Sequence, residues 1–451
     1  MGCTNAQDDP EPDQVVESRA EQLGSLPYIA RPTVREEHRG LSGVVRHATG
    51  RTYEGFNLYG SLTRGRILLR DMSGEIVASW NAENIFSDLA SFPLGREPLE
   101  RAGGRPAPGI MVAELHRGAL FTIESLSGIA KLDRDSNVLF ALNNNAHHDL
   151  DVSEDGTIYV LTAVPREIDL GSRSITVIDD QIEILSPRGE LRERHSIFEI
   201  LSESPRTRPL VEKQLRYASY WFDHLDEWFQ EKLSEDAQTR AAQESLFDFY
   251  RSLSLKKRRE LRRAHELYLL LHTPADILHS NALQVLSGGN TGDVLVSVRE
   301  LDLVAIVNVV SGEVSWSWGP GELSRQHQPS LLPDGNLLIF DNGTKRRSSR
   351  IIEVKPATQE IVWSYGETPG TKFFCGAMGG VQGLPNGNVL ITDSGAGRVL
   401  EVDRASETVW EFFNPDSGFN PFDINPAAET IEAIYRVTRV SPAELEAVQL
   451  R

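Results

Sequence analysis

The sequence predicts an all-β protein, a six-bladed β-propeller with a helical insertion of about 70 residues. The first observation behind this prediction is a repeated tryptophan at the end of the strand-like segments EVSW, EIVW and ETVW. Trp316, Trp363 and Trp410 stand at equal intervals of 47 residues (363 − 316 and 410 − 363), and EIVASW, ending at Trp80, is an earlier copy. Repeats of roughly 40 to 50 residues with four short strands each are typical of propeller blades.

The second observation is a turn-then-strand unit that recurs on both sides of the insertion. Each copy places glycine in a tight turn and follows it with a β-branched, apolar run: EDGTIYVLT, TGDVLVSV, PDGNLLIFD and PNGNVLITD. Such runs bounded by Gly, Asp, Asn and Pro read as short strands with tight connections. Extending the repeat in both directions gives about six blades.

In chain order, residues 1–35 read as a polar, proline-containing tether. Gly2-Cys3 followed by such a stretch is typical of a lipidated bacterial lipoprotein, although no apolar signal segment precedes it. We therefore expect a periplasmic or membrane-anchored lipoprotein facing the cell exterior, tethered through Cys3; a plain disordered tail is the alternative.

Short apolar runs typical of β-strands occur throughout residues 36–202 and again over 273–451, and we assign these ranges to the two halves of the propeller. Between them, residues 203–272 change character. Apolar side chains there recur at three- and four-residue spacing, which predicts amphipathic helices. The basic run KKRRELRR, from Lys256 to Arg263, reads as a solvated helix face, with a lid, a membrane-surface contact or a partner site as alternatives. The helical spacing is carried by Leu215, Ala218, Trp221, Phe222, Leu225, Trp228 and Phe229.

Composition restricts the function. A formal net charge of −19 and a pI near 5.1 argue against general nucleic-acid binding, so an anion site would need local positive charge. Two cysteines, Cys3 and Cys375, cannot build a disulfide framework. No apolar run reaches transmembrane length.

The repeats place histidines in register. Aligned on the turn glycines, His148 and His327 both stand eight residues ahead of their glycine; His279 stands 13 ahead, where LSGGNTG lengthens the turn. Seven residues beyond the glycines, two blades carry Arg299 and Asn342. Equivalent positions of propeller blades converge on the central channel. We therefore expect His148, His279, Arg299 and His327 to share a site.

Several alternatives stay open at this point. Arg299 either faces that channel or pairs with a carboxylate such as Glu300 or Asp302, because an unpaired guanidinium in an apolar strand is costly. His147 is either a second member of the site or a neighbour of His148. The repeated tryptophans are expected in blade cores. The remaining histidines read as surface groups: His38, His47, His116, His195, His224, His265 and His272.

Three imidazoles and one guanidinium in an acidic protein suit a tetrahedral oxyanion. Arginine presents a planar fork of donors to two oxygens at once. A neutral histidine can attack phosphorus or sulfur and form a covalent intermediate, while the other groups stabilise charge on the non-bridging oxygens. The GxxxxGK[ST] loop is absent from the sequence, which argues against a nucleotide-phosphate donor.

An ordered set of motifs resembles the bacterial arylsulfotransferase family, over roughly residues 50–200 and 274–415. The segment GFNLY…LLRDMSGEIVASW is similar to that family's opening blade. The other motifs are HHD (His147–Asp149), DILHSN (Asp276–Asn281), SVRE (Ser297–Glu300), RQHQPSLLPDGN (Arg325–Asn336) and FDNG (Phe340–Gly343).

The resemblance implies a six-bladed propeller that moves a sulfuryl group from an aryl sulfate donor to a phenolic acceptor, without the nucleotide donor PAPS. It implies a ping-pong route through a sulfohistidine, with no cofactor and no metal. By motif, His327 would be the nucleophile, and His279 and Arg299 would bind the sulfate oxygens. His148 (or His147) would assist as an acid or anion ligand, and Asn342 as a neighbouring donor to the substrate.

Two other functions use the same pattern. Three neutral histidines from separate strands could hold zinc, as in propeller lyases that act on peptidyl hydroxyglycine. A propeller can also be a non-catalytic binding scaffold, with the helical insertion as its contact surface.

A neutral nucleophilic imidazole predicts a dependence of rate on pH. We expect activity to fall below about pH 6.5, the ordinary pKa of imidazole, because protonation removes the attacking lone pair. The measurement is the rate of sulfuryl transfer across the histidine titration range, and a flat rate between about pH 5 and 8 would contradict this nucleophile.

Overall fold

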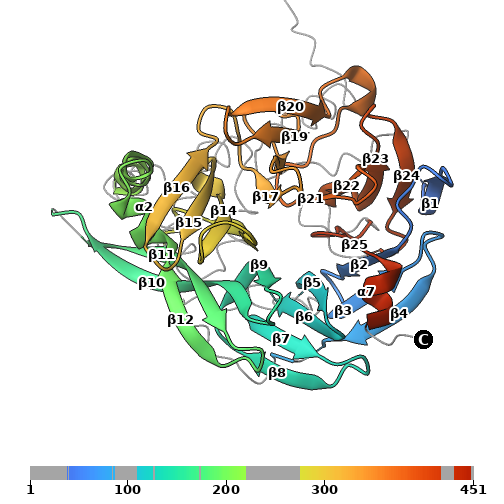
Figure 1. Cartoon of the computed structure of the whole chain (residues 1–451), viewed down its shortest axis with the longest axis horizontal. Helices are drawn as coiled ribbons and strands as arrows, with labels where there is room; N and C mark the ends of the chain where they lie inside the picture. The colour runs from blue at the N-terminus through green and yellow to red at the C-terminus, as the bar shows by residue number, and fades with distance from the viewer. Residues whose placement is uncertain are drawn as a thin grey trace, which may run out of the picture. The chain divides into compact units, whose positions relative to one another are not determined.

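A computed structural model describes residues 38, 40–83, 85–86, 109–124, 127–171, 174–219, 275–417 and 431–447. Its strands form six small antiparallel sheets, five with four strands and one with five. This confirms the predicted all-β class, a six-bladed β-propeller (Figure 1). By internal contacts the chain forms two compact units with three sheets each: the middle unit, Ala82–Leu323, and the terminal unit, Met1–Asn81 with Ser324–Arg451.

The middle unit holds three consecutive sheets, and in each of them the strands pair in sequence order. The turn glycines Gly156 and Gly292 lie between antiparallel neighbouring strands, as the sequence predicts. Its strands are β5 (Ile110–His116), β6 (Ala119–Glu124), β7 (Gly128–Leu132) and β8 (Val138–Leu142); β9 (Ala146–Val152), β10 (Ile158–Asp169), β11 (Ser174–Leu185) and β12 (Leu191–Ser196); and β13 (Ser280–Val285), β14 (Asp293–Val298), β15 (Leu303–Asn308) and β16 (Glu313–Trp318).

The terminal unit combines both ends of the described chain. β25 pairs with β2, and β1 adds a fifth strand beside β24, so segments distant in sequence complete two of its sheets. Its strands are β17 (His327–Leu331), β18 (Leu337–Asp341), β19 (Arg350–Lys355) and β20 (Glu360–Tyr365); β21 (Gly380–Gly383), β22 (Val389–Asp393), β23 (Arg398–Val402), β24 (Thr408–Phe413) and β1 (Gly43–His47); and β25 (Thr438–Val440), β2 (Phe56–Gly60), β3 (Arg66–Arg70) and β4 (Ile76–Asn81).

Arg439 fixes β25 to the rest of the terminal unit. Its Nε donates to Asn57 Oδ1 at 2.8 Å, and its Nη1 lies 3.1 Å from Glu401 Oε2, with both side chains fully buried. Removing one partner of such a buried pair leaves an uncompensated charge and typically costs about 3–5 kcal/mol. The short last strand is therefore held by a specific polar contact as well as by its three-residue ladder.

The repeated tryptophans all lie in the last strand of their repeat, but only two are core residues. Trp80 in β4 and Trp410 in β24 are almost completely buried. Trp316 and Trp363 are only half-buried, so the full burial of a core residue does not hold for these two. Trp363 packs against the edge of an apolar cluster that includes Leu338 and Ile351. Its other side is covered by the Arg404 guanidinium, 5.2 Å from the ring centroid, and its Nε1 donates to Arg404 O.

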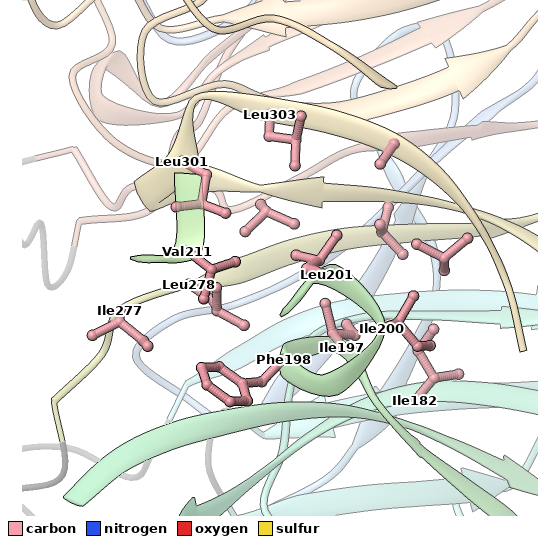
Figure 2. Close-up of a cluster of buried hydrophobic side chains, with 14 of the residues drawn as sticks. Ile182, Ile197, Phe198, Ile200, Leu201, Val211, Ile277, Leu278, Leu301 and Leu303 are labelled. Carbon is pink, nitrogen blue, oxygen red and sulfur yellow. The ribbon is translucent and has the colours of Figure 1, made fainter. Parts of the chain in front are cut away.

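A short helix covers part of the middle unit, where the sequence pattern had suggested continued sheet. α2 (Ile197–Glu203) begins at Ser196, whose side chain accepts a hydrogen bond from Glu199 N at 3.0 Å. Its buried side packs into an apolar cluster with residues of β11, β13, β14 and β15 (Figure 2). Fully burying each of its large apolar side chains contributes roughly 1.5–3 kcal/mol. These side chains are Ile197, Phe198, Ile200 and Leu201.

Side-chain acceptors join the first strand of one blade to the first strand of the next. Asp149 Oδ2 accepts from Leu283 N at 3.0 Å, and Asp151 Oδ2 accepts from Val285 N at 2.7 Å. These two N–H groups lie on the edge of the β13 sheet, where no neighbouring strand satisfies them. The carboxylates of β9 therefore satisfy backbone donors that the sheet alone leaves open.

Parts of the sequence interpretation fall outside the described residues. The tether with Cys3, the basic run Lys256–Arg263 and most of the predicted insertion (203–272) are among them; of the insertion, residues 208–219 are helical. Among the described helices, none is long and apolar enough to cross a membrane.

Two turn carboxylates predict how the middle unit responds to acid. Hydrogen bonds from Ser153 Oγ and Thr157 N lower the pKa of Asp155 from 3.8 to about 2, and hydrogen bonds from the Asn137 side chain and backbone lower that of Asp133. A carboxyl with a lowered folded-state pKa stabilises the fold fully above its ordinary pKa, and this contribution is lost as pH falls through the folded value.

We therefore expect the midpoint temperature of thermal unfolding to fall on acidification from about pH 4 to pH 2. It should fall less in Asp155→Asn, because the asparagine side chain does not titrate. Thermal unfolding followed by circular dichroism measures this. Glu154→Gln, in the same turn and exposed, is the matched control. Identical pH curves for wild type and Asp155→Asn would contradict the assignment.

Candidate functional site

The residues singled out by sequence form two groups, one in each unit. His147, His148, His279 and Arg299 belong to the middle unit; His327 and Asn342 belong to the terminal unit. Each group has its own geometry.

In the terminal unit, His327 opens β17 and is 3% exposed. Its Nδ1 lies 2.7 Å from Asn342 Oδ1 and 3.2 Å from Arg325 O. The ladder between β17 and β18 shifts register between His327 and Ser330, and Gln328 within that shift has a positive φ of 41°. Bulges of this kind re-aim a side chain at the end of a strand.

The Asn342 amide settles which nitrogen of His327 carries hydrogen. Its Nδ2, which can only donate, contacts Cys375 O at 2.8 Å and Met378 O at 2.6 Å, so Oδ1 faces the imidazole. Because Oδ1 can only accept, His327 Nδ1 must be the donor, and the lone pair of the neutral ring lies on Nε2. An imidazole held this way is oriented for base or nucleophile chemistry.

This geometry corrects the expected role of Asn342. Asn342 was expected to donate a hydrogen bond to the substrate, but both N–H groups of its amide donate to backbone carbonyls. Asn342 therefore acts through His327, as a positioning residue.

In the middle unit, His279 lies directly before β13 and pairs with Asp276. Its Nδ1 is 2.6 Å from Asp276 Oδ2, with about a quarter of each side chain exposed. The carboxylate fixes hydrogen on Nδ1 and leaves Nε2 as the working nitrogen. The backbone of His279 also accepts a hydrogen bond from Arg299 N at 3.2 Å.

The ring of His148, in β9, packs edge-on against the ring of His279. Their ring centroids are 4.8 Å apart at an interplanar angle of 62°. Both residues have left-handed backbones, with φ of 55° and 50°. The ladder shifts register beside each of them, in β9 and in β13. Non-glycine residues adopt this conformation at a cost of about 1–3 kcal/mol, and such strain clusters at functional sites.

His147 is not placed as a substrate ligand. It is 3% exposed, its Nδ1 is 2.8 Å from His148 Nδ1, and its Nε2 is 3.4 Å from Asp180 Oδ1. That last contact is longer than a hydrogen bond and is electrostatic. Both ring nitrogens therefore face protein groups, which corrects the expectation of a substrate-binding role.

Arg299 begins the 3₁₀ helix η2 (Arg299–Leu301) just after β14 and is 6% exposed. Its Nη1 lies 2.7 Å from Glu300 Oε1, which is the carboxylate pairing considered from sequence. The pair fixes one arm of a guanidinium that has five donors in all. Glu300 thus balances the charge of the Arg299 guanidinium and also fixes its orientation.

Sequence reasoning missed the two carboxylates that orient histidines. Asp276 stands three residues before His279 inside DILHSN, so its motif carried a usable signal. Asp180 lies in the apolar strand ITVIDDQIEIL, where a buried carboxylate needs a partner. Among the residues with described positions, no group of three or more His, Cys, Asp or Glu is arranged to hold a metal ion.

The backbone carbonyl of Cys375 accepts a hydrogen bond from Asn342, whereas its thiol is buried and bonded to the loop backbone. Burial raises the pKa of the thiol to about 12, and Sγ donates to Ala377 O at 3.0 Å. Its carbonyl accepts from Asn342 Nδ2 and from Ser349 Oγ. The residue is thus a structural member of the loop that positions His327.

The fold is a β-propeller, and hydrogen bonds to Asn342 and Asp276 hold the imidazole rings of His327 and His279 in fixed orientations. The family model described as Arylsulfotransferase (ASST) matches residues 126–415, more than half of the chain, and the chain belongs to this family. The match confirms the resemblance seen in the sequence.

Solved structures similar to this chain are distant. They include a protein of unknown function from Bacteroides caccae (12% identity, 86% of this chain and 99% of that chain, TM-score 0.47). The β-propeller domain of Cps50 (Swd1) from Myceliophteria thermophila has 9% identity, 84% and 91% coverage and a TM-score of 0.42. A catalytically inactive virginiamycin B lyase from Staphylococcus aureus, with quinupristin, has 9% identity, 83% and 88% coverage and a TM-score of 0.36. Among curated proteins, none matches.

The raised thiol pKa predicts that Cys375 is unreactive in the native protein. The thiolate is the reactive species, and with a pKa of about 12 only about one thiol in 10⁴ is ionised at pH 8. In a Cys3→Ser variant, we expect almost no reaction with Ellman's reagent under native conditions and one equivalent in guanidinium. Rapid reaction of one native equivalent would contradict the buried, protonated thiol.

Proposed function

We propose that this protein transfers a sulfuryl group from a phenolic sulfate ester to a phenol, independently of PAPS, by a ping-pong mechanism through a sulfohistidine at His327. Membership of the arylsulfotransferase family supports the reaction class. The observation that carries the residue assignment is the Asn342–His327 hydrogen bond, which places the imidazole lone pair on Nε2.

In the first half-reaction, His327 Nε2 attacks sulfur. The S–N bond forms, the S–O bond to the donor phenol breaks, and the leaving phenolate takes a proton from the protein. In the second half-reaction an acceptor phenol gives up its proton and its oxygen attacks the same sulfur, so the S–N bond breaks. The net reaction consumes no proton.

The middle-unit residues are assigned by their match to the family motifs. His279 and Arg299 stabilise the sulfate oxygens, and His148 exchanges the phenol proton. An imidazolium at His279 is balanced by the Asp276 carboxylate 2.6 Å from Nδ1, so its Nε2–H can donate to a sulfate oxygen. The Arg299–Glu300 pair orients a second cationic donor for the same charge.

The test uses purified protein in metal-free buffer, with 4-nitrophenyl sulfate as donor and phenol as acceptor. We expect nitrophenol release that a chelator leaves unchanged and that His327→Ala reduces on the order of 10⁴-fold or more. Asn342→Ala retains the nucleophile but loses the group that orients it, and we expect a decrease of about 10–100-fold. His195→Ala is the matched control, since the described partner of the His195 side chain in β12 is the exposed carboxylate of Glu193.

The remaining outcomes separate the other functions. No release together with stoichiometric zinc in the same preparation would favour a metal-dependent lyase. No release and no metal would favour a binding scaffold. Full activity in His327→Ala would overturn the nucleophile assignment.

A further inference from the structure

The middle unit contains a line of contacts that the transfer mechanism has not used. It runs from Asp180 Oδ1 to His147 Nε2 (3.4 Å), from His147 Nδ1 to His148 Nδ1 (2.8 Å), and from the His148 ring to the His279 ring (4.8 Å between centroids). Asp180 and His147 are 2% and 3% exposed, whereas His148 is half-buried. Because Asp180 and His147 are buried, a proton that reaches them along this line from a substrate passes through His148.

The direct contact between two Nδ1 atoms holds a single hydrogen, so one ring donates and the other accepts. Asp180 decides which. Its Oδ2 accepts from Ser280 N at 2.6 Å, and Oδ1 faces His147 Nε2. A lone pair on Nε2 would face a carboxylate oxygen, so the hydrogen of neutral His147 belongs on Nε2. His147 Nδ1 then accepts from His148 Nδ1–H, and the lone pair of neutral His148 lies on Nε2.

Resting on the function proposed above, we propose that the His147–Asp180 pair stores the proton that His148 exchanges with phenols. When an acceptor phenol delivers a proton to His148 Nε2, the hydrogen on His148 Nδ1 crosses to His147 Nδ1. His148 stays neutral, and His147 becomes an imidazolium beside the Asp180 carboxylate. The free enzyme that meets the donor therefore carries the stored proton on His147, with the hydrogen of His148 on Nε2. In the first half-reaction the leaving phenolate takes that Nε2 hydrogen, and the hydrogen on His147 Nδ1 returns to His148 Nδ1, which leaves the neutral pair. The acceptor phenol restores the stored proton in the second half-reaction, so protons balance over the two half-reactions.

The surroundings favour this storage. Asp180 Oδ1 lies 3.4 Å from His147 Nε2, and the other oxygen of this carboxylate is fixed by a hydrogen bond from Ser280 N. A buried positive charge is stabilised when it has a fixed, hydrogen-bonded counter-ion. His147 is thus a positioning and proton-holding residue that never contacts the substrate.

The test measures phenol release in a single turnover without acceptor, which isolates the first half-reaction. His147→Asn retains an acceptor for His148 Nδ1–H but cannot hold a proton. Phenolate is a poor leaving group that depends on protonation, whereas nitrophenolate leaves without it. We expect the burst rate to fall about 10–100-fold with phenyl sulfate and by no more than about twofold with 4-nitrophenyl sulfate.

His195→Asn is the matched control, because it removes another carboxylate-paired histidine from the same sheet. We expect its burst rates to match wild type with both esters. Equal losses with both esters in His147→Asn, or no loss with either, would overturn the proton-storage role.

A second measurement does not depend on activity. Nitrogen-15 NMR of labelled histidines reports which ring nitrogen carries hydrogen, and His147→Gln and His148→Gln assign the signals. The comparison is made in alkaline buffer, where the stored proton has been removed and both rings are neutral. In Asp180→Asn the amide NH₂ turns a donor toward His147 Nε2, and we expect the hydrogen of His148 to move from Nδ1 to Nε2. An unchanged His148 tautomer would overturn the inference. A wild type that transfers no sulfuryl group while the tautomers shift as described would instead refute the proposed function.

Discussion

The start of the first strand in several blades is held in a left-handed backbone conformation, and the candidate chemistry depends on that constraint. His148, His279 and Gly379, which stands eight residues before the turn glycine Gly387, have positive φ at this place, and Gln328 has it one residue after His327. Only glycine adopts it without cost; each other residue gives up about 1–3 kcal/mol of stability. The hydrogen bonds around these residues, from His279 Nδ1 to Asp276 Oδ2 and from Val381 N to Gln328 Oε1, offset that cost and fix where the side chains point.

A second constraint acts on the histidines themselves. An imidazole can serve as nucleophile or base only if its hydrogen is on the other nitrogen, and neighbouring groups decide this. Asn342 does so for His327, and Asp180 does so for His148 through His147. For His279, the Asp276 carboxylate instead serves as the counter-ion. In each case a residue that does not react sets the chemistry of one that can. Substitutions of these partners are therefore expected to affect rate more than folding.

The repeat in the sequence predicted the blades because each blade must bury the same apolar faces with the same turns. It also predicted His148 and His279 as neighbours, through their position relative to the turn glycines. It could not predict how Asp180 and Asn342 are placed to set the tautomers of the histidines. The contact between Asp180 and Ser280 N spans 100 residues, and the orientation of Asn342 depends on the loop carbonyls of Cys375 and Met378. It also overestimated how regular the repeat is, since Trp363 is only half-buried at the edge of its apolar cluster and carries the Arg404 guanidinium over its ring.

The central claim is that His327 carries the sulfuryl group. The most direct measurement is peptide mass mapping after incubation with 4-nitrophenyl sulfate alone and an alkaline quench, which preserves a nitrogen-bound sulfuryl group. We expect a sulfuryl adduct on the peptide containing His327, which disappears when phenol is added before the quench. Nitrophenol release without any adduct, or an adduct on a different histidine, would contradict this account.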